Sequence, residues 1–127
     1  MGRSFDAIPD HLVSWMEEQP IFFVASAPLD PEGLVNVSPK GGDTFRVVDQ
    51  STVVYQDLTG SGAETIAHTR ENGRLTIMFC SFGEKPNIVR LFGRGGPLAL
   101  AVALNAVFDG ADDTRPSRVV LQTPVRA

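Results

Sequence analysis

Residues 35–41 read Val-Asn-Val-Ser-Pro-Lys-Gly, and this segment carries the side chains best suited to hold a ligand. Its polar members, Asn36, Ser38 and Lys40, are each separated from the next by one residue. In a β-strand, this period of two places all three side chains on one face. An amide, a hydroxyl and an ammonium group in a row predict either a solvent-exposed strand face or one wall of a site for an anionic ligand.

A second candidate anion site lies at residues 60–64, which read Gly-Ser-Gly-Ala-Glu. Ser61 and Glu64 have the spacing of a capping box, which marks the start of a helix. The flanking glycines allow close approach of a ligand, and a helix N-terminus offers backbone N–H groups and a positive dipole end. Lys40 would add a mobile charge to these fixed dipoles. The alternative is a well-capped helix that binds nothing, with His68 and Glu64 forming a surface pair one turn apart.

Two arginines, two histidines and one cysteine complete the set of candidate site residues. Arg90 and Arg94 share one face of an expected strand, where they either hold a carboxylate or phosphate or extend to solvent. His11, His68 and Cys80 are too scattered for a zinc site. The sequence shows no P-loop and no nucleophile elbow. It therefore singles out no catalytic residue and no metal site.

The elements that must position these residues are mainly strands joined by short turns. Apolar runs bounded by turn residues predict six strands, at residues 21–27, 34–40, 45–48, 52–58, 74–82 and 87–94. A possible seventh strand covers residues 118–123, and residues 97–108 are expected to form a buried helix or a pair of strands.

Two helices are expected beside these strands. Apolar residues recur every three or four positions over residues 9–18, and a helix of about eight residues ends near Asn72. Short connections favour antiparallel pairing, and this number of strands suggests a small barrel. The predicted fold is therefore mainly β: a six- to seven-stranded antiparallel barrel with an N-terminal helix and one inserted helix.

The composition indicates one soluble domain that covers residues 1–127. Hydrophobic residues make up 43% of the chain and charged residues 20%, which is ordinary for a globular protein. The net charge of -4 argues against a nucleic-acid or anionic-membrane surface. No apolar run reaches the about 20 residues of a membrane-spanning helix, no signal peptide is recognised, and the single cysteine fits a reducing compartment. We therefore expect a cytoplasmic protein without nucleic-acid or membrane partners.

Taken together and in this order, the segments resemble the pyridoxamine phosphate oxidase-like flavoproteins. The resemblance is carried by residues 33–41, 57–68, 72–80 and 88–95. It covers roughly residues 8–95, and residues 96–127 form an atypical tail of the same domain. It implies a split β-barrel that binds FMN and works as a homodimer, with the flavin at the subunit interface.

The resemblance also implies roles for individual residues and an activity. The expected cofactor contacts are Lys40, Ser61, Gly62 and Thr65 on the phosphate, Asn36 and Ser38 on the ribityl chain or ring, and Arg90 on cofactor or substrate. The implied activity is that of an FMN-dependent oxidoreductase acting on an unidentified small molecule. The alternatives are a different cofactor such as a deazaflavin, a non-catalytic flavin- or haem-binding module, and a degenerate family member that serves as an interaction domain.

Overall fold

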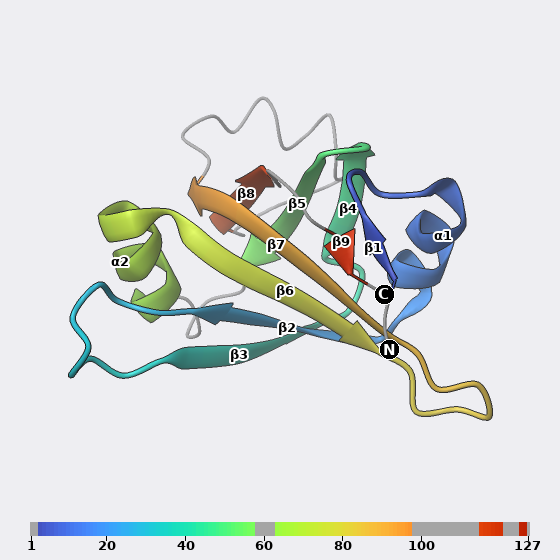
Figure 1. Ribbon diagram of the computed structural model, residues 1–127, viewed down its shortest axis with the longest axis horizontal. Coiled ribbons are helices and arrows are strands. Elements are labelled where there is room, and N and C mark those ends of the chain that lie inside the picture. Colours follow the sequence, from blue (N-terminus) through green and yellow to red (C-terminus); the bar gives the residue numbers. More distant parts are fainter. Residues whose placement is uncertain (1–2, 58–62, 98–114, 121–124, 127) are drawn as a thin grey trace.

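The chain is mainly β in the computed structural model, which describes residues 3–57, 63–97, 115–120 and 125–126. The elements follow in the order β1 (Ser4–Phe5), α1 (Asp10–Glu18), β2 (Ile21–Ser26), β3 (Asn36–Gly41), β4 (Phe45–Asp49), β5 (Thr52–Asp57), α2 (Ala63–Asn72), β6 (Arg74–Cys80), β7 (Ile88–Pro97), β8 (Arg115–Val120) and β9 (Val125–Arg126) (Figure 1). Both predicted helices and all six predicted strands are confirmed, with ends that shift by a few residues.

The strand count differs from the prediction. The described residues form nine strands, where six or seven were expected. The two additional strands, β1 and β9, have two residues each and pair with one another, and so short a strand leaves no periodic pattern in a sequence. The predicted last strand is present as β8, which begins at Arg115. Of the segment 97–108, only Pro97 lies within the described residues, at the end of β7.

Every strand pair in the described residues is antiparallel. The strand order is β3-β2-β6-β7-β8-β5-β4, and β9 pairs with both β1 and β7. The pairs β2–β3, β4–β5 and β6–β7 are hairpins, as the short turns between them predict. The pairs that β8 forms with β5 and β7 join parts of the chain far apart in sequence.

The sheet curls around a core on one of its faces. Although β2 and β4 are separated by four strands in the sheet order, the rings of Phe22 and Phe45 lie 5.5 Å apart. Phe79 on β6 stacks on Phe22 at 5.3 Å, and Tyr55 on β5 lies 6.0 Å from the same ring. These four aromatic side chains are buried and connect distant strands across the interior. In the described part of the chain, β3 and β4 stand at the two ends of the curled sheet.

The two helices lie at opposite ends of the long strands β6 and β7 (Figure 1). Helix α1 begins after Pro9 and ends before Pro20, and it buries Leu12 and Met16 against the core. Helix α2 contacts β2, β6 and β7. It ends at Asn72 and is followed by Gly73, whose φ of 75° is the left-handed conformation that glycine adopts without strain. Neither helix of the described chain has the length and apolar character needed to span a membrane.

Candidate functional site

The three polar side chains of β3 face the interior of the curled sheet. The register with β2 pairs Asn36 with Ser26, Ser38 with Val24, and Lys40 with Phe22. Directly paired residues share a face of the sheet, and the β2 side chains on this face belong to the buried interior. Ser38 and Lys40 are accordingly only 8% and 6% exposed.

The valines of the same segment lie on the other face. Val35 is 69% exposed and Val37 is 60% exposed. The interpretation of the polar face as a solvent-exposed strand surface is therefore wrong, because the polar face is the buried one. Polar side chains buried on one face while valines are exposed on the other reverse the usual pattern of a half-buried strand. This reversal favours the alternative interpretation, in which the polar face is one wall of a binding site.

The first turn of α2 lies against the start of β3. Asn36 Nδ2 donates hydrogen bonds to Ser38 Oγ at 3.0 Å and to Thr65 Oγ1 at 3.2 Å. Thr65 is only 3% exposed. Because both hydroxyl oxygens accept a hydrogen from the same amide, each hydroxyl keeps its own hydrogen to donate to a further group. Asn36 thus orients two hydroxyl donors that come from different elements.

The helix N-terminus adds further donors at this place. Ser61 and Gly62 lie outside the described residues, and α2 begins directly after them, at Ala63. Thr65 is the third residue of α2, so the cluster adjoins the first turn, whose backbone N–H groups have no partner within the helix. Lys40 lies about 7 Å farther along the inner face than Ser38, which is two residues away on the strand. The arrangement suits a negatively charged group with several oxygen atoms.

The turn that follows Lys40 is fixed by its own contacts. Thr44 Oγ1 donates to Gly41 O at 2.9 Å, and Arg46 Nη1 lies 2.5 Å from Asp43 Oδ1. The hydrogen bond and charge of Arg46 lower the pKa of Asp43 below its ordinary value. Because Asp43 is exposed, this ion pair adds little to stability, but it holds the chain that leaves β3.

Arg90 lies away from this cluster. It pairs with Met78 on β6 and stands between Val89 and Leu91, which are both fully buried. Alternation along β7 therefore directs Arg90 to the outer face, where it is exposed. The structure describes five of the predicted site residues, and Asn36 is in direct contact with two of them, Ser38 and Thr65. The structure places Lys40 on the same face as these three and leaves Arg90 on the opposite face.

His68 adjoins the cluster in a way that the sequence did not indicate. His68 Nδ1 lies 2.9 Å from Ser26 Oγ, and Ser26 pairs with Asn36 across the β2–β3 hairpin. The predicted surface pair of His68 with Glu64 is not found among the described contacts. Helix α2 packs on the end of β2, and this packing gives His68 a partner 42 residues away in sequence. A contact of this kind leaves no signal in sequence spacing.

A known protein shares much of this sequence. A pyridoxamine 5'-phosphate oxidase family protein of Aspergillus flavus, ustO, is 52% identical over 93 residues. The matched region is 72% of this chain but 37% of that protein, so the chain spans little more than a third of the length of its curated relative. No family model matches the chain.

Several solved structures share the fold. A protein of Lactobacillus delbrueckii, named as a candidate pyridoxamine 5'-phosphate oxidase, has a TM-score of 0.72 at 15% identity and matches 96% of this chain and 95% of its own. An FAD-binding protein of Mesorhizobium loti has a TM-score of 0.62 at 13% identity, over 100% and 99% of the two chains. An FMN-binding protein of Syntrophomonas wolfei has a TM-score of 0.62 at 10% identity, over 92% and 86%. At such low identities the likeness shows the fold alone.

Proposed function

Since the chain belongs to the pyridoxamine 5'-phosphate oxidase family, we propose that it binds FMN and acts as an FMN-dependent oxidoreductase on a small molecule. The observation that carries this proposal is the polar cluster at the N-terminus of α2, in which the half-buried Asn36 joins the buried Ser38 and Thr65. That two proteins of the same fold are named as FAD- and FMN-binding supports a flavin as the ligand.

The residues present fit the polar part of FMN, which has a phosphate group and a ribityl chain with several hydroxyls. The hydroxyl hydrogens of Ser38 and Thr65 and the N–H groups of the first turn of α2 are donors for such oxygen atoms. Lys40, on the same inner face, supplies a positive charge. The resemblance adds Ser61 and Gly62, directly before α2, to this set. The donor set therefore suits an anion rather than a cation.

The protein and the cofactor have separate tasks in this proposal. FMN, when bound, supplies the redox chemistry. Lys40 balances the charge of the phosphate, and Asn36 keeps the hydroxyls of Ser38 and Thr65 oriented as donors. Because these groups are already linked before a ligand arrives, binding requires little further ordering. No side chain is assigned as an acid or base.

We further propose that the protein is a homodimer and that Arg90 contributes to the site of the partner copy. The edge strand β3 and the residues before it expose Leu34, Val35 and Val37, at 86%, 69% and 60%. Exposed apolar side chains along a sheet edge are typical of an interface. Arg90 lies on the outer face of an interior strand, so it reaches a flavin on an inner face only from a second copy. Light scattering on the purified protein should give the mass of a dimer, and Val37→Lys should give a monomer.

The test of flavin binding is a titration of the purified chain with FMN, riboflavin and FAD. We expect FMN to bind with absorption bands at about 370 and about 450 nm, as for an oxidised flavin. Riboflavin has no phosphate and should bind at least about tenfold more weakly, because charge-assisted hydrogen bonds are lost. Equal affinity for riboflavin and FMN would contradict the phosphate site. Absence of FMN binding at high micromolar concentration would overturn the proposal.

Enzymatic activity needs a separate measurement. The FMN-loaded protein should oxidise a reduced nicotinamide in the presence of an electron acceptor. A protein that binds FMN but does not oxidise a reduced nicotinamide cofactor would be a flavin carrier or sensor. Titrations with a deazaflavin and with haem, run in parallel, test the two alternative cofactors.

A further inference from the structure

His68 lies on the face of α2 that carries the proposed flavin site. Thr65 and His68 are three residues apart in this helix, so their side chains are neighbours. Thr65 contacts Asn36 on β3, whereas His68 Nδ1 lies 2.9 Å from Ser26 Oγ on β2. Ser26 and Asn36 are directly paired across the β2–β3 hairpin. The imidazole therefore lies beside the polar cluster of the candidate site.

Ser26 determines which nitrogen of the imidazole carries a hydrogen. Ser26 is 4% exposed, and within the described chain its hydroxyl has one hydrogen-bond partner, His68 Nδ1. A buried hydroxyl needs an acceptor for its single hydrogen, so Ser26 Oγ donates and Nδ1 accepts. In a neutral imidazole the ring hydrogen is then on Nε2. Ser26 thus makes Nε2 a hydrogen-bond donor of fixed orientation.

This donor is available to a ligand. Among the residues that the structure describes, none accepts a hydrogen bond from His68 Nε2. Glu71, which lies one turn farther along α2, accepts from the backbone N–H of Leu29 instead. Because His68 is half-buried, its Nε2–H is partly removed from water and favours an acceptor.

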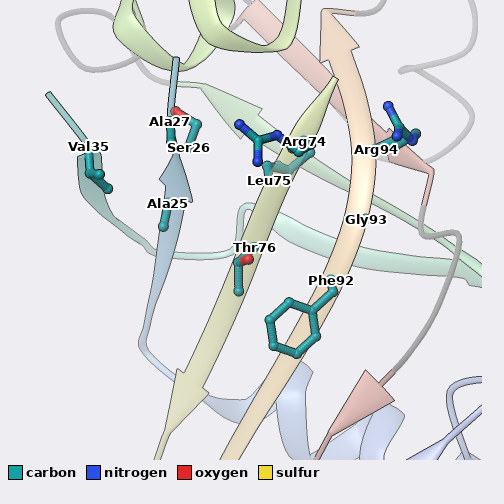
Figure 2. A pocket seen from close by; sticks show the side chains of 10 residues that line it. All are labelled: Ala25, Ser26, Ala27, Val35, Arg74, Leu75, Thr76, Phe92, Gly93 and Arg94. Carbon is teal, nitrogen blue, oxygen red and sulfur yellow. The ribbon is translucent and has the colours of Figure 1, made fainter. Parts of the chain in front are cut away.

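The position of His68 directs this donor to the inner side of the sheet. A cavity of about 540 Å³ borders Ser26 at the end of β2, but His68 does not line it (Figure 2). Its walls include Val35 and Phe92, which lie on the outer face that is assigned to the partner copy. His68 adjoins Thr65 and Asn36, so we expect its ligand at the polar cluster.

We propose that His68 is a further cofactor-binding residue, which donates from Nε2 to a phosphate oxygen of FMN. This inference rests on the proposed function and deepens it. The site then has three side-chain donors, and a neighbouring side chain orients each of them: Asn36 orients the hydroxyls of Ser38 and Thr65, and Ser26 orients His68. Because hydrogen bonds to a charged acceptor are strong, a third oriented donor favours a flavin with a phosphate over one without.

Two substitutions of His68 separate a contact with FMN from the contact with Ser26. The amide of asparagine lies near the place of Nδ1, so His68→Asn keeps an acceptor for Ser26 and loses the donor at Nε2. The amide of glutamine reaches the place of Nε2, so His68→Gln keeps that donor and loses the acceptor. FMN should bind about tenfold more weakly to His68→Asn and within about threefold of its original affinity to His68→Gln. Riboflavin, which has no phosphate, should bind to both variants as it does to the unchanged protein.

His11→Asn is the matched control, because His11 is an exposed histidine of α1 whose described ring contact is with Phe5. It should leave the affinity for FMN unchanged, and a thermal melt verifies that each variant is folded. A larger loss in His68→Gln than in His68→Asn would mean that His68 only supports Ser26, and this result would overturn the proposal, as would equal effects of the two substitutions. Absence of FMN binding to the unchanged protein would overturn the proposed function as well.

NMR of the unchanged protein with isotope-labelled histidine tests the same contact without a substitution at His68. The chain has two histidines, so the ring signals that remain in His11→Asn belong to His68. At about pH 8, above the ordinary titration range of histidine, the ring hydrogen should be on Nε2. FMN should shift the Nε2–H signal, and riboflavin should leave it in place. A hydrogen on Nδ1, or equal shifts with the two flavins, would contradict the proposal.

Discussion

Asn36 links hydroxyl groups of two different elements, and the donor geometry of the candidate flavin site depends on this link. Its amide nitrogen reaches Ser38 on its own strand and Thr65 in the first turn of α2. An amide that is partly removed from water needs partners for its hydrogen-bonding groups. Loss of either hydroxyl should therefore affect both the stability of the protein and the proposed ligand site.

Replacement of Thr65 by valine tests this link with little change in shape. Thr65→Val removes one acceptor of Asn36 and one proposed donor to FMN, so FMN should bind about tenfold more weakly and unfolding should require about 1 kcal/mol less. Thr69→Val is the matched control, because among the described residues Thr69 Oγ1 contacts the α2 carbonyls of Thr65 and Ile66 and no residue of β3. Urea denaturation and FMN titration measure both effects. Equal losses of FMN affinity in the two variants would contradict a ligand role for Thr65.

Lys40 carries the positive charge of the same face, and its removal gives a second prediction. Lys40→Ala should weaken FMN binding by about 1.5–3 kcal/mol, the range for a hydrogen bond to a charged group. Lys85→Ala is the control, since Lys85 is an exposed lysine of the β6–β7 turn. The affinity of Lys40→Ala for riboflavin should change much less than its affinity for FMN. Unchanged FMN affinity in Lys40→Ala would refute its contact with the phosphate.

At the scale of elements, the position of α2 decides whether the site is assembled. The end of α2 is fixed by Gly73, whose N–H donates to Thr69 O and whose carbonyl accepts from Gly95 N on β7, both at 2.9 Å. The same end contacts Arg74 on β6 and Arg94 on β7 through Asn72. A change at this helix end is therefore expected to act on the β6–β7 hairpin as well as on α2.

Gly73→Ala measures how strongly this helix end contributes to the stability of the protein. A side chain at φ 75° is strained, so the variant should lose about 1 kcal/mol of unfolding free energy. Gly83→Ala is the control, because Gly83 lies outside the left-handed region and an added Cβ meets no atom within 4 Å. Urea denaturation of both variants should show the loss only for Gly73→Ala. A similar loss in Gly83→Ala would mean that the φ of Gly73 is not the cause.

At the scale of the whole molecule, the curl of the sheet depends on aromatic contacts between strands far apart in the strand order. Phe22 contacts the rings of Phe45, Tyr55 and Phe79, which lie on three other strands. Phe22 also pairs with Lys40 across the β2–β3 hairpin. The core that closes the curled sheet thus supports the inner face of the candidate site directly.

Phe22→Ala should cost about 3–5 kcal/mol of unfolding free energy, since it leaves a cavity at the centre of this cluster. That is a large part of the stability of an ordinary domain, so Phe22→Leu provides a milder variant if the alanine variant does not fold. Phe82→Ala is the matched control, because Phe82 is 87% exposed and its loss should change stability by less than about 0.5 kcal/mol. Chemical denaturation measures all three variants, and equal effects at Phe22 and Phe82 would contradict this account of the core.

The sequence by itself determined the elements of this protein. Periodicity and turn residues are local properties of the backbone, so they predicted α1, α2, the hairpins and the polar face of residues 36–40 correctly. The short strands β1 and β9 were missed because two residues contain no period.

Only the tertiary structure decided which faces are buried and which side chains meet. Alternation in β3 defines two faces, but the register with β2 and the curl of the sheet bring Asn36, Ser38 and Lys40 inward and leave the valines exposed. The same packing joins Asn36 to Thr65, joins His68 to Ser26, and directs Arg90 outward. These outcomes depend on contacts between residues that are distant in sequence. The free energy of such contacts is a property of the whole core, so no local segment predicts them.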